Sequence, residues 1–171
     1  MLTNRKMFQN AWVVDDLETA CEQWAFEFGV GPFFVSEYRN VFEDVIYRGQ
    51  PGKLDMLVAL AQNGPIQIEL IQPLVDQCAY RDSVPSGTGF HHMCVFSDNF
   101  EEDHQYLTSK GYVAANTARV GNVAFGYYDT RSVMGCMLET VTSNPATEER
   151  FAQIAAAGEH WDGKTVIQEW R

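Results

Sequence analysis

Four polar side chains in otherwise apolar segments are the first candidates for chemistry: Gln9, Glu69, His92 and Glu139. Glu69 lies in IQIELIQ, Glu139 in CMLETV, Gln9 in MFQNAWVV, and His92 directly follows His91 in GFHHMCVF. A lone carboxylate inside an apolar strand is unfavourable, and a metal ion or a hydrogen-bonding site would remove that penalty. One amide oxygen, two carboxylates and one imidazole suit a divalent cation that keeps positions open for water.

Strand periodicity indicates which way these side chains point, because successive residues on a strand face opposite sides of a sheet. In IQIELIQ the alternation separates Glu69 from the isoleucine and leucine face. In CMLETV it places Glu139 among apolar neighbours on its own face. Of the adjacent histidines only one can face a given site. We expect His92 to face it and His91 to point the other way, in a structural role.

The elements that must position these residues follow an order that occurs twice. Asp15 or Asp16 is a good N-cap for the first helix, and Gly29 ends it. The apolar pattern predicts strands over 7–14, 33–38, 41–48, 54–61 and 66–73 around a helix over 16–28. It then predicts strands over 91–97, 112–120, 123–130 and 136–142 around a helix over 99–110, followed by a helix over 146–157 and an ordered surface arm over 159–171.

An internal repeat accounts for this order. A shift of 83 residues places Gln9 on His92 and Asp15 on Asp98, and each half ends in an apolar strand that contains one glutamate. Each half therefore has a strand, a helix and about three further strands. We expect a single domain over 1–171, with one module over 7–74, a second over 90–142, and a C-terminal helix and tail over 143–171.

Composition and charge limit the classes of partner. The 171 residues are 46% hydrophobic and 13% aromatic, with a formal net charge of −11, and they contain no Lys/Arg run. Nucleic acid and anionic membranes are therefore unfavourable partners. No apolar run is long enough to span a membrane, and the N-terminus has no signal-peptide pattern. The four cysteines form no CxxC pair, which is typical of a cytoplasmic protein with reduced thiols.

The same segments resemble the vicinal oxygen chelate superfamily, which includes glyoxalase I, methylmalonyl-CoA epimerase, extradiol dioxygenases and bleomycin-binding proteins. The similar stretches are QNAWVVDDLETA, IQIELIQPL, GTGFHHMCVFSDNFEE and YYDTRSVMGCMLETV, which together span residues 9–142. The chain looks most similar to methylmalonyl-CoA epimerase and glyoxalase I. The resemblance implies an α+β fold in which two βαβββ modules form a cupped mixed sheet around a divalent metal. It assigns the ligand positions to Gln9, Glu69, His92 and Glu139.

Three departures from the family pattern qualify this assignment. Methylmalonyl-CoA epimerase usually has histidine where Gln9 stands, so the ligand set is more similar to that of glyoxalase I. A second catalytic glutamate expected near QPGKLDMLV is missing, and Asp55 is the nearest carboxylate. Extradiol dioxygenases use two histidines and one glutamate, so the set found here disfavours an iron site that activates oxygen.

These observations lead to a hypothesis about function. We expect a metal-dependent isomerase, epimerase or lyase that abstracts a proton next to a metal-polarised carbonyl, with Glu139 as the base and Glu69 as the second choice. The metal is Zn, Ni, Co, Mn or Fe, and the substrate is a small carbonyl compound or a thioester. The alternatives are a non-catalytic resistance-type binding protein and an extradiol-type dioxygenase. The resemblance also implies a homodimer. For an anionic group of the substrate, Arg48, Arg119 and Arg131 are the candidate partners.

Overall fold

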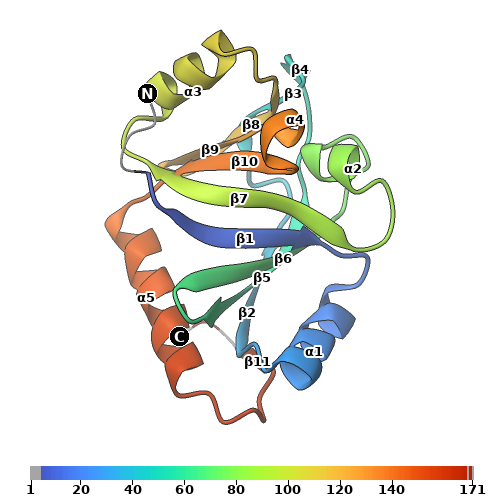
Figure 1. Ribbon diagram of the computed structural model, residues 1–171, viewed down its shortest axis with the longest axis vertical. Helices are drawn as coiled ribbons and strands as arrows, with labels where there is room; N and C mark the ends of the chain where they lie inside the picture. The colour runs from blue at the N-terminus through green and yellow to red at the C-terminus, as the bar shows by residue number, and fades with distance from the viewer. Residues whose placement is uncertain (1–4, 169, 171) are drawn as a thin grey trace.

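A computed structural model describes residues 5–168 and 170 of the chain (Figure 1). In the first part of the chain it contains β1 (Met7–Val13), α1 (Leu17–Phe28), β2 (Phe33–Tyr38), β3 (Glu43–Tyr47), β4 (Gln50–Pro51), β5 (Met56–Asn63), β6 (Ile66–Pro73) and α2 (Ala79–Ser83). The remainder contains β7 (Gly89–Ser97), α3 (Phe100–Ser109), β8 (Ala114–Val120), β9 (Val123–Tyr128), α4 (Arg131–Met134), β10 (Met137–Thr142), α5 (Pro145–Glu159) and β11 (Ile167–Gln168).

One mixed sheet organises the molecule. Its strand order is β11-β2-β5-β6-β1-β7-β10-β9-β8-β3-β4. The four central strands are β6, β1, β7 and β10. β1 pairs with β6 in parallel and with β7 in antiparallel, and β7 pairs with β10 in parallel. The sheet is cupped, and the helices lie around it rather than alternating with the strands along one parallel sheet (Figure 1). The predicted α+β class and the cupped mixed sheet are confirmed.

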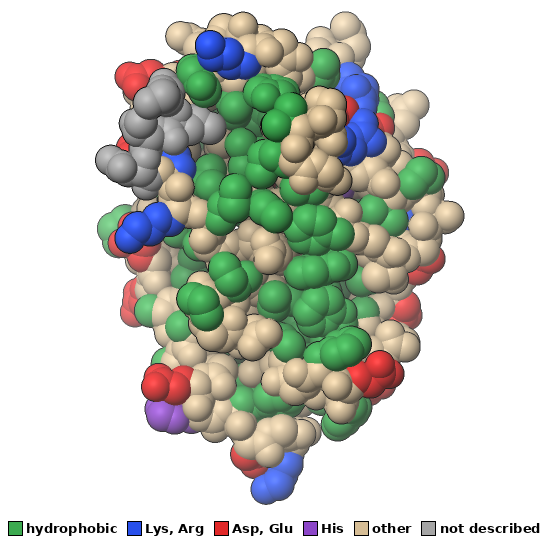
Figure 2. Space-filling model, viewed as in Figure 1, with side chains coloured by type: hydrophobic (Ala, Val, Ile, Leu, Met, Phe, Trp, Pro, Cys, Tyr) green, Lys and Arg blue, Asp and Glu red, His purple; other side chains and the backbone are tan. Residues whose placement is uncertain are grey.

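The two faces of the sheet bury different side chains. The inner face holds a large apolar cluster that includes Met56, Val58, Ile71 and Tyr80. On the outer face, α1 covers Ile68 and its neighbours, and α3 covers a smaller cluster beside β9 and β10. Figure 2 shows apolar side chains gathered across the middle of the face that carries β1 and β7.

Local sequence explains where the main helices begin. The side chain of Asp16 accepts a hydrogen bond from the backbone N–H of Thr19, and Asn99 and Asn144 cap α3 and α5 in the same way. Gly29 ends α1 at φ 67°, a left-handed conformation that favours glycine. Each of these helices differs from its predicted range by at most two residues at either end.

The segment predicted as a strand over 41–48 differs most from expectation. It forms the shorter strand β3, which pairs with β4 on one side and with β8 on the other. Asp44 and Arg48 have φ near +50°, and the β3–β8 register shifts between Glu43 and Ile46. A strand from the first half of the chain therefore extends the sheet beyond the strands of the second half.

The C-terminal segment returns to the opposite edge of the sheet. α5 packs against β5, and β11 pairs with β2 in parallel (Figure 1). The predicted surface arm over 159–171 thus contributes a short edge strand, while Glu169 and Arg171 lie outside the described residues. None of the described helices combines the length and the apolar character that crossing a membrane requires.

Candidate metal centre and its cavity

The four central strands bring the predicted site residues together. Gln9 lies on β1, Glu69 on β6, His92 on β7 and Glu139 on β10. The register forms one row from Glu69 through Ala11 to His92, and a second row that joins Gln9 to Glu139 through Cys94. Side chains in such rows face the same way.

The two halves of the central sheet correspond to each other: β1 is equivalent to β7, and β6 is equivalent to β10. Under this correspondence the first row takes the place of the second. Gln9 therefore occupies the position equivalent to His92, and Glu69 the position equivalent to Glu139.

Glu69, His92 and Glu139 converge on a common point. Their candidate ligand atoms all lie within 4.8 Å of one another. The Nε2 atom of His92 is 2.9 Å from Oε2 of Glu139 and 3.3 Å from Oε2 of Glu69. Metal–ligand bonds of about 2.1 Å in tetrahedral or octahedral geometry place neighbouring ligand atoms roughly 3.0–3.4 Å apart. The two measured separations fit that geometry, so this cluster could bind a divalent metal.

Two buried atoms of the cluster have no hydrogen-bond partner among the residues that the structure describes. They are Nε2 of His92 and Oε2 of Glu69. The Nε2 atom of His92 lies 2.9 Å from Oε2 of Glu139, so it can donate a hydrogen bond to that oxygen only when it carries a proton. Buried polar atoms without a partner are unfavourable unless something else satisfies them. A cation placed among the three side chains would satisfy both atoms, so the residues present fit a metal.

A β-bulge places His91 beside His92. Trp12 pairs with Phe90 while Ala11 pairs with His92, so His91 is an extra residue in β7. The Nδ1 atoms of the two histidines are 2.8 Å apart, and the ring of His91 also packs against Tyr127. The prediction that His91 points away from the site is therefore wrong, because strict alternation fails at a bulge.

This arrangement assigns the proton positions on both rings. Nε2 of His91 lies 3.1 Å from the carbonyl oxygen of Ala79, which can only accept a hydrogen bond. His91 therefore carries its proton on Nε2 and accepts at Nδ1 from the Nδ1–H of His92. The remaining nitrogen of His92, Nε2, faces the two carboxylates. A neutral His92 would direct its lone pair at them, and a metal ion or a proton between the imidazole and the carboxylates removes that repulsion.

Burial and charge shift the ionisation of the cluster. Burial opposes a charge on His92, but Glu139 and Glu69 outweigh it and raise the pKa of His92 to about 9. Burial raises the pKa of Glu69, and the neighbouring His92 offsets part of that effect. Burial, together with the adjacent His92, lowers the pKa of His91 well below its usual range. In the absence of a metal, a proton on His92 supplies the positive charge that the carboxylates require.

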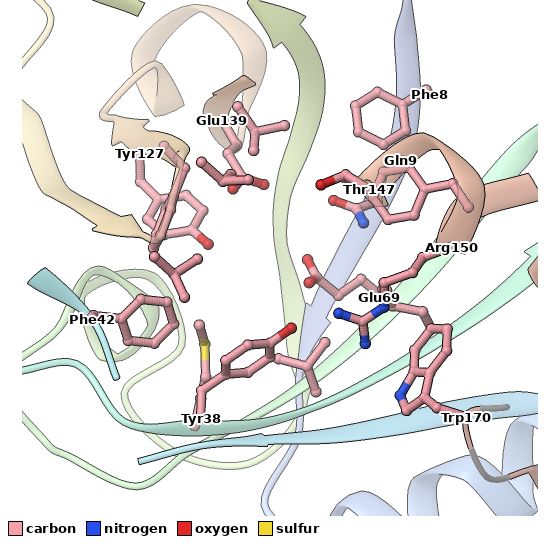
Figure 3. Close-up of a pocket in the computed structure, with 18 residues that line it drawn as sticks. Phe8, Gln9, Tyr38, Phe42, Glu69, Tyr127, Glu139, Thr147, Arg150 and Trp170 are labelled. Atoms are coloured by element: carbon pink, nitrogen blue, oxygen red, sulfur yellow. The ribbon is translucent and has the colours of Figure 1, made fainter. Parts of the chain in front are cut away.

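Gln9 lies next to the cluster with its amide oxygen unengaged. Its Nε2 donates to Oε1 of Gln67 at 2.6 Å, and both glutamines are buried. This bond uses one of the two N–H donors of the amide, and the amide oxygen could serve as a metal ligand. Figure 3 shows the Gln9 side chain at the wall of a pocket that also contains the carboxylates of Glu69 and Glu139.

That pocket is a cavity of about 300 Å³ on the inner face of the sheet. Apolar and aromatic side chains form most of its wall, with Gln9, Glu69 and Glu139 as polar groups (Figure 3). Thr147, Arg150 and Phe151 of α5, together with Trp170, complete it. A mostly apolar cavity with a few converging polar groups is the usual form of a small-molecule site.

Several sequence candidates lie elsewhere. Asp55 accepts a hydrogen bond from the backbone N–H of Asn40 at 2.8 Å and pairs with Lys53 at 2.7 Å, and it does not line the cavity. It therefore has a structural role and does not replace the missing glutamate.

The three arginines proposed for an anionic group also lie outside the cavity. Arg48 pairs with Asp82, Arg131 with Asp129, and Arg119 with Glu101. Sequence reasoning missed the C-terminal residues of the cavity, Thr147, Arg150, Phe151 and Trp170. The signal available for them was the ordered, tryptophan-containing arm.

Fold and cluster together define a class: a cupped α+β protein with a candidate centre of two carboxylates and one imidazole on three of its four central strands. The model of the glyoxalase/bleomycin resistance protein/dioxygenase superfamily matches residues 8–127, so the chain belongs to this superfamily. The resemblance to the vicinal oxygen chelate superfamily is thereby confirmed. No curated protein sequence matches the chain significantly.

Solved structures share the fold. Methylmalonyl-CoA epimerase from Mycobacterium tuberculosis is similar at 20% identity with a TM-score of 0.58, covering 87% of this chain and 97% of its own. A hypothetical protein from Bacillus halodurans C-125 is similar at 17% identity with a TM-score of 0.57, covering 83% and 96%. A methylmalonyl-CoA epimerase in complex with methylmalonyl-CoA and NH4+ is similar at 17% identity with a TM-score of 0.56, covering 82% and 96%.

Proposed function

We propose that this protein is a divalent-metal-dependent isomerase, epimerase or lyase that removes a proton next to a carbonyl group. The observation that supports the proposal best is the convergence of Glu69, His92 and Glu139, two of which leave buried atoms without partners, at a mostly apolar cavity. Superfamily membership and the fold shared with methylmalonyl-CoA epimerases also support it.

The residues divide into ligands and proton carriers. Glu69, His92 and Glu139 would hold the ion, with the amide oxygen of Gln9 as a fourth donor, and Zn, Ni, Co, Mn and Fe all suit this set. When bound, the ion would supply Lewis-acid polarisation of the substrate carbonyl, which acidifies the adjacent C–H bond. The hydrogen bond from His92 to His91 orients the imidazole so that Nε2 of His92 faces the two carboxylates.

We assign the proton transfer to Glu139, with Glu69 as the second candidate. Both carboxylates line the cavity, and their side chains are only 9% and 14% exposed. The base accepts the proton from the carbon next to the carbonyl. The base then gives up the proton. Its return to the same carbon is epimerisation, its transfer to a neighbouring carbon is isomerisation, and its transfer to a leaving group is elimination. Most of the cavity wall around the two carboxylates is apolar.

The substrate that suits this cavity is a small carbonyl compound or the acyl part of a thioester. The thioester option draws on the similar methylmalonyl-CoA epimerase whose structure contains methylmalonyl-CoA. The family resemblance further supports a homodimer, two modules over 7–74 and 90–142, and a C-terminal extension over 143–171. A cytoplasmic location agrees with four buried, free cysteines. Light scattering in solution would test the homodimer.

Metal analysis tests the central proposal. We expect the purified protein to carry near-stoichiometric divalent metal, and His92→Ala to lose it. His160→Ala is a matched control, because His160 is exposed at the end of α5 and lies outside the cavity. A screen of 2-oxo acids, hemithioacetals and acyl-CoA thioesters would then identify the substrate.

Three outcomes would contradict the proposal. Full activity after exhaustive metal removal would exclude a metal-dependent reaction. A wild-type protein that takes up no metal at near-stoichiometric concentration would favour a non-catalytic binding protein. Oxygen consumption with catechol-like compounds would favour an extradiol-type dioxygenase.

A further inference from the structure

We propose that the substrate of this cavity carries an anionic group, a carboxylate or a phosphate, that is bound by Arg150 at the end remote from Glu139. The inference rests on the proposed function, because it assumes that the carbonyl end of the substrate lies at the cluster of Glu69, His92 and Glu139. It adds the charge and polarity of the rest of the molecule.

Two neighbours, Trp170 and Ser36, contact the Arg150 guanidinium, although Arg150 is exposed. Its central carbon lies 4.0 Å from the centre of the Trp170 ring, a cation–π stack, and Nη2 is 3.3 Å from Oγ of Ser36. The indole is itself fixed, because its Nε1–H donates to Oγ of Ser36 at 3.0 Å and to the carbonyl oxygen of Val35 at 3.1 Å. The arginine is therefore pre-positioned by β2 and the C-terminal arm.

Arg150 differs in charge from every other part of the cavity wall. Among the described side chains that line the cavity, Arg150 is the one lysine or arginine. The acidic side chains in the same wall are Glu69 and Glu139. Figure 3 shows the guanidinium and the indole of Trp170 across the pocket from Glu139 and Tyr127. Arg150 thus lies on the opposite side of the cavity from Glu139, with Glu69 drawn between them and apolar side chains such as Phe42 and Val58 in the wall.

No carboxylate in the described part of the chain forms an ion pair with Arg150, whereas Arg48, Arg119 and Arg131 each have such a partner. Stacking on an indole occupies one face of the guanidinium plane and leaves N–H donors at its edge. The planar fork of donors matches a carboxylate or a phosphate in a bidentate manner.

Metal-chelating hydroxamates provide probes with defined ends. Butanohydroxamate presents two vicinal oxygens and a methyl end, and succinic monohydroxamate has the same length with a carboxylate in place of the methyl group. Pairs with one or two further methylenes allow for the unknown span, and 3-phosphonopropanohydroxamate replaces the carboxylate with a phosphonate. Calorimetry on Zn²⁺-loaded protein would give the affinity of each probe.

Arg150→Gln removes the charge, and Arg39→Gln is the matched control because Arg39 is exposed and pairs with Glu37 outside the cavity. We expect an acid-ended probe to bind the wild type and Arg39→Gln about tenfold or more tightly than its methyl-ended partner. In Arg150→Gln this preference should disappear, while butanohydroxamate retains its affinity within about twofold, which shows that the metal centre is intact. Comparing the affinities of succinic monohydroxamate and 3-phosphonopropanohydroxamate shows whether the site prefers a carboxylate or a phosphate-like group.

Two results would overturn the inference while the proposed function stands. One is equal binding of acid-ended and methyl-ended probes by the wild type at every length, and the other is a preference that survives Arg150→Gln. If none of the hydroxamates binds the Zn²⁺-loaded protein, the proposed metal–carbonyl chemistry fails, and this inference fails with it.

Discussion

At the scale of single residues, the proposed function gives Glu139 two tasks, metal binding and proton transfer, that a conservative substitution can separate. Glutamine keeps an oxygen donor of nearly the same shape but cannot accept the substrate proton. We therefore expect Glu139→Gln to retain near-stoichiometric metal and to lose turnover by about 10²–10⁴-fold, the usual contribution of a general base. The measurement is the exchange of the substrate's α-hydrogen in D2O, followed by NMR, next to metal analysis of the same sample.

The exposed Glu22 on α1 provides the control for this variant. Glu22→Gln should exchange the substrate proton at the wild-type rate. Should Glu139→Gln also exchange it at that rate, the base must be sought elsewhere, and Glu69→Gln would be the next variant to measure.

His91 acts on the site only through His92. Its Nδ1 accepts from the Nδ1–H of His92 and so keeps Nε2 directed at the carboxylates. Partners of this kind typically contribute 10–100-fold to metal affinity. We expect His91→Phe to weaken metal binding by that factor, measured by competition with a chromophoric chelator.

Tyr80→Phe is the matched control for His91→Phe. Tyr80 is fully buried beside His91, and its hydroxyl bonds to Tyr127 and Met56 rather than to His92. Both variants lose a buried polar contact and should lose stability by about 1–3 kcal/mol. A similar fall in metal affinity in both would mean that general loosening of the inner core, rather than orientation of His92, explains the effect.

Residue patterns predict part of this site and miss the rest for a physical reason. Strand alternation and the internal repeat place Gln9, Glu69, His92 and Glu139 on one face, and the register brings them to four adjacent strands. The bulge that places His91 beside His92 depends on pairing with β1, a strand about 80 residues earlier in the chain. A local pattern of period two contains no information on that pairing.

At the scale of elements, predictions succeed where local signals suffice. The cap candidates Asp15 and Asp16 and the terminator Gly29 bound the first helix to within one residue. They fail where a distant partner decides the outcome: β3 joins β8 across the two halves, and Trp170 and Arg150 meet above β2. Such pairings depend on surfaces that exist only once the chain has folded.

Asp55 connects the start of β5 to the turn after β2, and its charge makes that link dependent on pH. The backbone N–H of Asn40, followed by Lys53, lowers its pKa below the ordinary value of 3.8. A group whose pKa is lowered by folding stabilises the folded state above its unfolded value, and this contribution is lost as the pH falls through the folded value. We expect Asp55→Asn to be about 1–2 kcal/mol less stable than the wild type at pH 7.

Urea unfolding between pH 7 and pH 3 would measure this difference. The gap between the wild type and Asp55→Asn should narrow as the pH falls below about 4. The exposed Asp76 supplies the control, and Asp76→Asn should differ little from the wild type at any pH. A gap that stays constant down to pH 3 would show that the carboxylate charge of Asp55 does not contribute.

At the scale of the whole molecule, the cavity is lined by residues far apart in the sequence, from Phe8 to Trp170. The cluster comes from three strands of the sheet, β6, β7 and β10, while Arg150 of α5 and Trp170 line another part of the wall. The formal net charge of −11 favours the approach of cations over that of anions. An anionic substrate must therefore meet positive charge inside the cavity, and the bound ion together with Arg150 would provide it.

Metal binding should appear as stability of the entire fold, because the centre joins β6, β7 and β10 and the unfolded chain cannot hold the ion in this geometry. A ligand that binds only the folded state at 100 times its dissociation constant stabilises that state by about 2.7 kcal/mol. For a chain of this length, about 1 kcal/mol shifts the unfolding midpoint by about 2–4 °C. We expect removal of the metal by a chelator to lower the midpoint by about 5–10 °C, as followed by circular dichroism.

His92→Ala separates this effect from a general influence of the chelator. The variant lacks a ligand, so its midpoint should be the same with and without the chelator, whereas His160→Ala should respond as the wild type does. A chelator-dependent shift that persists in His92→Ala would place the stabilising ion at another site. Because the net charge is strongly negative, the affinity for the ion, and with it the shift at a fixed metal concentration, should decrease as salt is added.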